Sequence, residues 1–188
     1  MTEVEKRTAI FNATLDLISE HGFHGAPISK IAKQSGVSAG IIYHYFADKD
    51  DLIKALYVHI KEQLLEAMLV GNPHDAPWPD GFITLWLNSY QYYVRHPQQA
   101  SFIEQYENSP FPQYDENEAL MEKYAQLIPL IQSAQAKGYV KDLPFQVIYE
   151  LTLRVAAGLA KQQIKGSLTL TEDQLFKVAD ACHAAIAR

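Results

Sequence analysis

Apolar residues recur at intervals of three and four along almost the whole of this 188-residue chain. This spacing places them on one face of an α-helix, in which about 3.6 residues complete a turn. No stretch between turn residues alternates apolar and polar positions in the way that a half-buried β-strand does. We therefore expect an all-α fold of about nine helices.

Glycine, proline and capping residues mark where these helices begin and end. Asp48, with Asp51 three residues later, is expected to cap the start of the fourth helix. Residues 71–80 contain three prolines and no apolar period, which predicts a joint between parts of the chain. We place one domain at 1–48 and a second at 49–188, with 49–70 as the connecting helix. The expected helices are 3–21, 28–35, 39–46, 49–70, 81–95, 98–108, 115–137, 144–165 and 172–187.

The segment 28–46 meets the steric requirements of two short helices that are joined by a tight turn. Ala32 is small enough to lie where the two helices nearly touch, and Gly36 can adopt the positive φ that the turn needs. The apolar residues available for the core between them are Ile31, Val37 and Ile42. The segment therefore predicts a helix-turn-helix, with the first helix completing a three-helix head.

The helix expected at 39–46 has two different faces. One arc has the apolar residues Ile41, Ile42, Tyr45 and Phe46, and the other has Ala39, Gly40, Tyr43 and His44. Small residues allow close approach to another molecule, and donors on the rings can reach phosphates or base edges. The pattern favours a DNA-contacting face, although an ordinary three-helix core with surface aromatics would produce the same pattern.

Charge is distributed unevenly in this chain, whose formal net charge is −6. That value argues against a nonspecific coat on nucleic acid. Residues 1–47 contain equal numbers of acidic and basic side chains, so the later residues account for the whole excess of acid. Binding to phosphate must then depend on local placement. If two chains bind DNA as a symmetric pair, we expect only about 4–6 phosphate contacts for the pair.

The motifs at 23–25 (FHG) and 28–53 (ISKIAKQSGVSAGIIYHYFADKDDLI), with the long helix that follows, resemble the DNA-binding head of the tetracycline-repressor (TetR) family. The match extends over residues 10–54, and beyond it only the length and the helical architecture are similar. Ser29 stands where the family more often has threonine, and the serine retains the hydroxyl group. The resemblance implies phosphate contacts from Ser29, Ser38 and Lys49, close passage of Ala39 and Gly40 over base edges, and phosphate or base contacts from Tyr43 and His44.

The last two expected helices have stripes suited to dimerisation. Small residues allow backbones to approach closely, and the apolar positions recur at three and four. The candidate interface residues are Val155, Gly158, Leu159, Gln162, Leu175, Val178, Cys182 and Ile186. The resemblance implies that both helices pair with their symmetry mates in a homodimer that reads a pseudo-palindromic DNA operator. The same stripes would also suit the core of a single chain.

The middle of the chain is rich in aromatic residues, with both tryptophans and most of the eleven tyrosines. Aromatic walls with a few polar tips are typical of pockets for flat, apolar or cationic ligands. For any single residue, a place in the core is the alternative. The candidate pocket residues are Tyr57, Trp86, Tyr90, Tyr93, Phe102, Tyr106, Tyr124 and Tyr149.

These features together predict a DNA-binding transcription regulator that a small effector controls. Repression is the usual sense of the family that the chain resembles, so the resemblance implies a repressor. We expect an aromatic or hydrophobic ligand, with cations among the candidates, to release it from double-stranded operator DNA. Control by a protein partner is the alternative. The sequence has no phosphate-binding glycine loop, metal-ligand spacing or nucleophile–base pair, so we expect no enzyme activity, cofactor or metal. The single cysteine and the lack of a membrane-spanning run or signal peptide predict a cytoplasmic protein.

Overall fold

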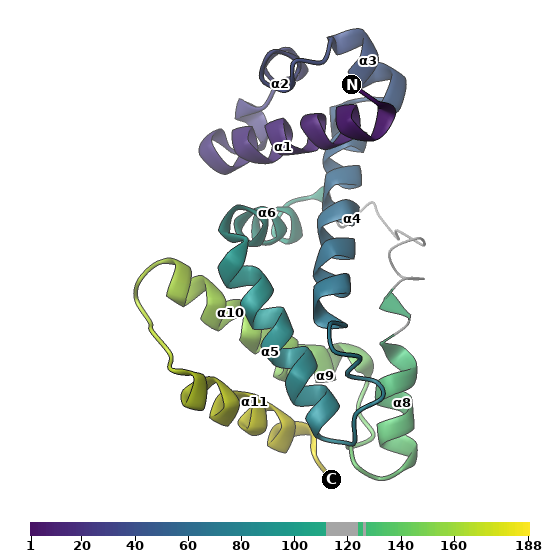
Figure 1. The fold of residues 1–188 in the computed structure, drawn as a ribbon, viewed down its shortest axis with the longest axis vertical. Coiled ribbons are helices and arrows are strands. Elements are labelled where there is room, and N and C mark those ends of the chain that lie inside the picture. Colours follow the sequence, from purple (N-terminus) through teal and green to yellow (C-terminus); the bar gives the residue numbers. More distant parts are fainter. Residues whose placement is uncertain (112–123, 126) are drawn as a thin grey trace. The chain divides into compact units, whose positions relative to one another are not determined.

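The computed structural model describes residues 1–111, 124–125 and 127–188 (Figure 1). Within these ranges the chain forms ten α-helices and one 3-10 helix. The described residues also contain an isolated antiparallel bridge between Val140 and Ala187. The predicted all-α fold is confirmed.

Two compact units make up the chain. Unit 1 contains residues 1–60 and the described part of 101–115, and unit 2 contains 61–100 and the described part of 116–188. Helices α4 (Lys49–Met68) and α6 (Pro97–Glu107) contribute residues to both units. The domain boundary expected at residue 48 stays a prediction.

Unit 1 begins with α1 (Glu3–His21), which starts in a capping box between Thr2 and Glu5. It continues through the 3-10 helix η1 (Phe23–Gly25), α2 (Ile28–Ser35) and α3 (Ala39–Tyr45). Helix α1 packs against η1 and α2, and α2 packs against α3. The three residues expected in the core of the helix-turn-helix are all buried there: Ile31, Val37 and Ile42.

The start of α4 is capped by the two aspartates that the sequence indicated. The backbone N–H of Asp51 donates to the carboxylate of Asp48 at 2.8 Å, and that of Ala47 donates to the carboxylate of Asp51 at 2.8 Å. Both bonds satisfy N–H groups that have no partner within the helix. The predicted capping of α4 is thus confirmed.

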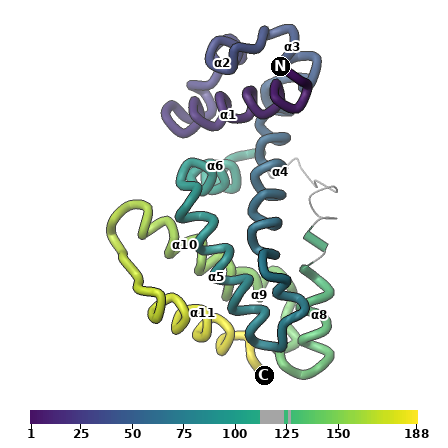
Figure 2. The backbone as a smooth tube through the Cα atoms, in the orientation of Figure 1, coloured from purple at the N-terminus to yellow at the C-terminus, as the bar shows by residue number. Residues whose placement is uncertain are grey.

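Unit 2 is arranged around α5 (Asp80–Arg95), which packs against α10 (Leu153–Ile164) and α11 (Glu172–Ile186). Helix α9 (Phe145–Leu151) contacts both α10 and α11. Near its end the chain is held by backbone bonds, from Lys141 to Ile186 at 2.8 Å and from Arg188 to Tyr139 at 3.2 Å. Figure 2 shows the C-terminus beside the turn that follows α8 (Ile128–Ala136).

The single helix expected at 144–165 is wrong, because the chain breaks at Thr152 and forms α9 and α10 instead. Thr152 has φ −128° and ψ −82°, outside the helical region. Its hydroxyl donates to the carbonyl of Ile148 at 2.6 Å, and its own carbonyl accepts a hydrogen bond from the indole of Trp86 at 3.1 Å. The hydrogen bond from Trp86 on α5, which is distant in sequence, therefore stabilises a break that the neighbouring residues do not predict.

The segment at 71–80, expected as a joint, lies against α5 within unit 2. A Cβ on Gly81 would come within 2.0 Å of the carbonyl oxygen of Pro73, so this approach requires glycine. The amide of Asn88 donates to the carbonyls of Met68 and Val70 at 3.1 and 2.9 Å, which satisfies the end of α4. The segment thus packs closely on the helices that it joins.

The helix expected at 115–137 is described in part. Helix α8 lies within that range, whereas residues 112–123 and 126 lie outside the described residues. No helix in the described part of the chain combines the length and the apolar character needed to span a membrane.

Candidate functional site

The turn between α2 and α3 has the geometry of a helix-turn-helix. Gly36 ends α2 with φ 68° and ψ 15°, a left-handed conformation that glycine adopts without steric cost. Ser38 precedes α3 in an extended conformation, and its hydroxyl accepts a hydrogen bond from the backbone N–H of Ile41 at 3.4 Å. The two helices are therefore fixed at the angle that the turn defines, with the start of α3 at the surface.

The two faces of α3 differ as the sequence predicts. Ile42 is fully buried and Phe46, directly after the helix, is only 3% exposed. On the opposite face, Tyr43 is 55% exposed and His44 is also exposed. The apolar arc thus faces the core of unit 1 and the other arc faces outward, where it is free to meet another molecule.

Gly40 has no packing role inside the chain. A Cβ placed on it would meet no atom within 4 Å, and its φ is not in the left-handed region. Glycine inside a helix costs about 0.5–1 kcal/mol relative to alanine. Packing within the chain therefore does not explain a glycine at this exposed helical position, and close passage over DNA bases stays a prediction.

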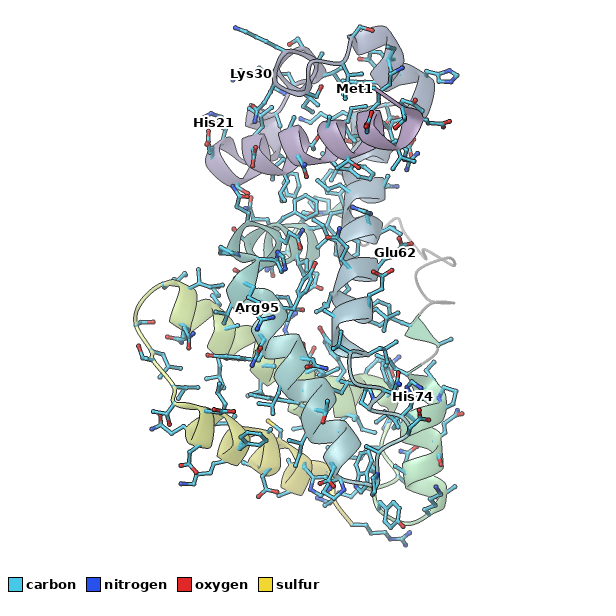
Figure 3. The ribbon with its side chains drawn as sticks, viewed as in Figure 1. Met1, His21, Lys30, Glu62, His74 and Arg95 are labelled. Carbon is cyan, nitrogen blue, oxygen red and sulfur yellow. The ribbon has the colours of Figure 1, made fainter. Side chains whose placement is uncertain are left out.

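The remaining predicted phosphate contacts lie on α2 and at the start of α4. Ser29 is exposed, as is the neighbouring cation Lys30 on α2 (Figure 3). Lys49 is half-buried, and its ammonium group donates to the backbone carbonyl of Phe23. An ammonium group has three donors, so this bond leaves Lys49 able to bind a phosphate as well.

Arg7 joins α1 to Phe46, the residue directly after α3, a contact that sequence reasoning missed. Its guanidinium lies 5.5 Å from the ring centroid of Phe11 and 5.2 Å from that of Phe46. Contacts of this kind between a cation and an aromatic face contribute about 0.5–1 kcal/mol at exposed sites. The signal available in the sequence was a cation four residues before Phe11 on one helical face.

Comparison with known families decides the identity of this arrangement. Residues 10–56 match the model of bacterial regulatory proteins of the tetR family, and residues 77–187 match the model of the tetracyclin repressor-like C-terminal domain. The chain belongs to the TetR family. It is therefore a DNA-binding transcription regulator and not an enzyme.

Curated relatives resemble this TetR-family chain in its N-terminal part. The HTH-type transcriptional regulators BetI of Klebsiella pneumoniae and Escherichia coli are 48% and 47% identical to it over 64 residues. That stretch covers 34% of this chain and 33% of the length of each relative.

Solved structures match over nearly the whole chain. A TetR family transcription regulator from Marinobacter aquaeolei has a TM-score of 0.88 with 22% identity, over 98% of this chain and 97% of that one. A TetR-family regulator from Haemophilus influenzae has a TM-score of 0.83 with 23% identity, over 99% and 98%. At these identities the likeness establishes a shared fold.

The aromatic residues predicted to bind an effector fall into two groups. The first lies in unit 1, where Tyr57 stacks on Tyr106 with 4.0 Å between ring centroids and donates to Glu107 at 3.3 Å. Phe23 of η1 makes edge contacts with Phe102 and Phe111. Through these rings α6 packs against the helix-turn-helix unit.

The second group lies in unit 2 and is largely buried. Trp86 stacks on Tyr90 at 5.9 Å, and the Tyr90 hydroxyl donates to Gln163 at 2.5 Å. Burial raises the pKa of Tyr90 above its ordinary value. Tyr93 is buried on the same helix, and the Tyr124 hydroxyl donates to the backbone carbonyl of Lys61 at 3.2 Å. Effector binding by these residues stays a prediction.

Unit 2 also contains a small cavity of about 30 Å³ between α5, α8 and α9. Tyr149 is the predicted effector residue on its wall, and Thr152 lines it at the break between α9 and α10. Aliphatic side chains make up most of the remaining wall, and the aromatic pattern gave no indication of them. No three His, Cys, Asp or Glu side chains in the described ranges are arranged to hold a metal ion.

The predicted dimer residues differ in exposure within a single chain. Gly158 and Gln162 are exposed on α10, and Val155, Leu159, Leu175 and Val178 are half-buried. Cys182 and Ile186 are buried against their own chain, at 5% and 0% exposure. Large apolar side chains that sequence reasoning did not select are exposed on the same helices, Ile164 at 39% and Phe176 at 47%.

Proposed function

We propose that this TetR-family chain is a homodimeric repressor that leaves its operator when a small hydrophobic ligand binds unit 2. The observation on which the proposal depends most is the outward face of α3, where Gly40 leaves open space beside the exposed Tyr43 and His44. Side chains on such a face can approach base edges in a major groove, which is wide enough to admit a helix. Ser29, Ser38 and Lys49 would contact the flanking phosphates, and Ala39 would lie over the bases.

A symmetric pair of chains follows from the way in which helix-turn-helix proteins read DNA. A two-fold dimer presents two recognition helices to half-sites separated by about one helical turn or a multiple of it. We assign the interface to the outward faces of α10 and α11, where Gly158, Ile164 and Phe176 are exposed. Exposed apolar side chains next to a glycine favour close packing of one helix against another.

Ligand control would act through the helices that belong to both units. Residues of α4 lie in unit 1 up to Ile60 and in unit 2 from Lys61 onward, and α6 is divided in the same way. A ligand that binds one arrangement of unit 2 more tightly shifts the population toward it, and α4 and α6 transmit that shift to the head. A coupling of about 1–3 kcal/mol is typical of allosteric proteins and would suffice. Because the matched family consists of bacterial regulatory proteins, the proposed repressor would meet its DNA in the cytoplasm.

A protein partner in place of a small molecule is the second candidate, and the exposed apolar residues of α10 and α11 favour it. If these residues do not serve a homodimer, they form a surface for another protein. Sedimentation of the purified chain tests whether these residues are available to a partner, because a homodimer that forms through them leaves them buried.

Footprinting on the DNA that flanks the coding region tests the proposed function. We expect protection of two symmetric half-sites about one turn apart, and loss of protection with an effector from a panel of aromatic and hydrophobic compounds. Protection of a site that lacks two-fold symmetry would contradict the dimeric mode. Protection that every compound leaves unchanged, together with capture of one specific protein on the α10–α11 surface, would favour the second candidate.

A further inference from the structure

The cavity in unit 2 lies where α5, α8, α9 and the start of α10 leave a gap that side chains do not fill. Its wall includes Phe82 and Leu85 from α5, Ile131 from α8, and Phe145 and Ile148 from α9. Its volume is about 30 Å³. A gap of this kind forfeits the dispersion contacts that its lining atoms would otherwise make. An occupant of matching shape would recover those contacts.

The chemistry of the wall selects an uncharged, apolar occupant. Thr152 is the polar residue at the helix break. Its hydroxyl donates to the carbonyl of Ile148, and its carbonyl accepts from the indole of Trp86, so both oxygens have partners. None of the described lining residues has a charge. A cation or carboxylate placed here would lose its hydration without a partner, which is strongly unfavourable. The wall therefore favours hydrocarbon.

The volume limits how much hydrocarbon can enter. One water-sized group needs about 10–15 Å³ of such space, and a cavity that holds benzene measures about 150 Å³. By these two measures the cavity accommodates roughly one to three carbon atoms, which is the end of an alkyl chain. Its wall includes half-exposed side chains, Leu130 and Leu153 among them, so a longer molecule can extend from the cavity toward the surface.

We infer that this cavity binds the short, uncharged alkyl end of the effector, while the rest of the effector lies outside the cavity. That the bound molecule is an effector rests on the proposed function, whereas its binding to the cavity does not depend on DNA. The position of the cavity links its occupancy to α10. Thr152 forms part of the wall and begins α10, the helix to which we assign the dimer contact. An occupant that presses on Thr152 would thus alter the start of α10.

Tryptophan fluorescence of a Trp78→Phe variant gives a direct test, since Trp86 is then the remaining tryptophan and bonds to Thr152. The probes are 1-propanol to 1-octanol, with tetramethylammonium as a charged comparison. Each buried methylene contributes a factor of about four in affinity. We expect the dissociation constant to fall about fourfold per carbon over roughly one to three carbons and then to level off. Tetramethylammonium should leave the fluorescence unchanged.

A matched pair of variants on α8 locates the binding. Leu130→Phe fills the cavity from its half-exposed rim and should weaken octanol binding at least about tenfold, with the helical circular dichroism preserved. Gln132→Phe places the same ring on the exposed side of α8 and should leave binding unchanged. Equal binding by both variants, tight binding of tetramethylammonium, or no dependence on chain length would overturn the inference. Alcohols that bind as expected but never release operator DNA would support the cavity and contradict the proposed effector control.

Discussion

The ammonium group of Lys49, the first residue of α4, donates a hydrogen bond to the backbone carbonyl of Phe23 in η1. This bond joins the start of the long helix to the turn that precedes α2. A residue expected to contact phosphate therefore also fixes the helix-turn-helix on α4. Its two roles predict two separable effects.

Replacement of Lys49 by Met should lower both the stability of the protein and its electrostatic attraction to DNA. Loss of a charged hydrogen bond costs about 1.5–3 kcal/mol in the free energy of unfolding, discounted here because the side chain is only half-buried. Each lost phosphate contact lowers the slope of log affinity against log salt by about 0.9, hence by about 1.8 per dimer. Urea unfolding and operator titrations at several salt concentrations measure the two effects. Lys33→Met on the exposed surface of α2 is the comparison. If the slope of log affinity against log salt is unchanged in Lys49→Met, Lys49 has only a structural role.

Removal of the Tyr43 ring should weaken operator binding by about 1–3 kcal/mol, because the ring would contact phosphate or base edges. The fold should be unaffected, since this side chain is 55% exposed. Tyr139→Ala is a matched control, because that tyrosine is 48% exposed in unit 2. Fluorescence anisotropy with labelled operator gives both affinities. Equal affinities for the two variants would mean that the recognition face is assigned wrongly.

Gly40→Ala should have opposite effects on stability and binding. Alanine in place of glycine within a helix stabilises it by about 0.5–1 kcal/mol, and no atom of the chain obstructs the added methyl group. On the DNA, the same methyl group would occupy the clearance above the bases and weaken binding. Thermal unfolding and operator titration together test this, and a more stable variant with undiminished affinity would show that Gly40 does not face DNA.

Gly158→Trp should dissociate the dimer while each chain stays folded. An added Cβ at Gly158 meets no atom within 4 Å of its own chain, so a large side chain points outward. At a close-packed interface it would weaken association by about tenfold or more. Sedimentation velocity over a range of concentrations gives the dissociation constant, with Gly158→Ala as the conservative comparison. A fully dimeric Gly158→Trp would move the interface elsewhere.

The thiol of Cys182 should react slowly with alkylating agents at neutral pH. Burial raises the pKa of this thiol above its ordinary value. The thiolate is the reactive form, so the reaction should accelerate only as the pH rises above the ordinary range for cysteine. Mass spectrometry after timed iodoacetamide treatment measures the rate, with urea-unfolded protein as the reference. Equal rates for folded and unfolded protein at neutral pH would contradict the burial.

Much of the fold follows from local signals in the sequence. Helices α1 and α2 begin and end where the capping residues and glycines place them, because Thr2, Gly22 and Gly36 act through their immediate neighbours. The division of α3 into two faces follows from its period in the same way. These features depend on interactions between residues a few positions apart.

Features that depend on distant residues could not be predicted. No glycine or proline marks Thr152, and the break there is stabilised by Trp86 from another helix. The same limit applies to the candidate effector site. Aromatic stripes indicate burial, but they do not distinguish a filled core from a cavity, and the observed cavity is lined mainly by aliphatic side chains. Likewise, the bond from Lys49 to Phe23 spans 26 positions.

Selection of bound sequences from a pool of random DNA duplexes tests most directly whether two copies of α3 read DNA. We predict enrichment of one pseudo-palindrome with half-sites about a helical turn apart, bound by two chains and lost when Tyr43 and His44 are both replaced by alanine. A pool that yields no enriched sequence, or one without two-fold symmetry that the double variant still binds, would contradict the account.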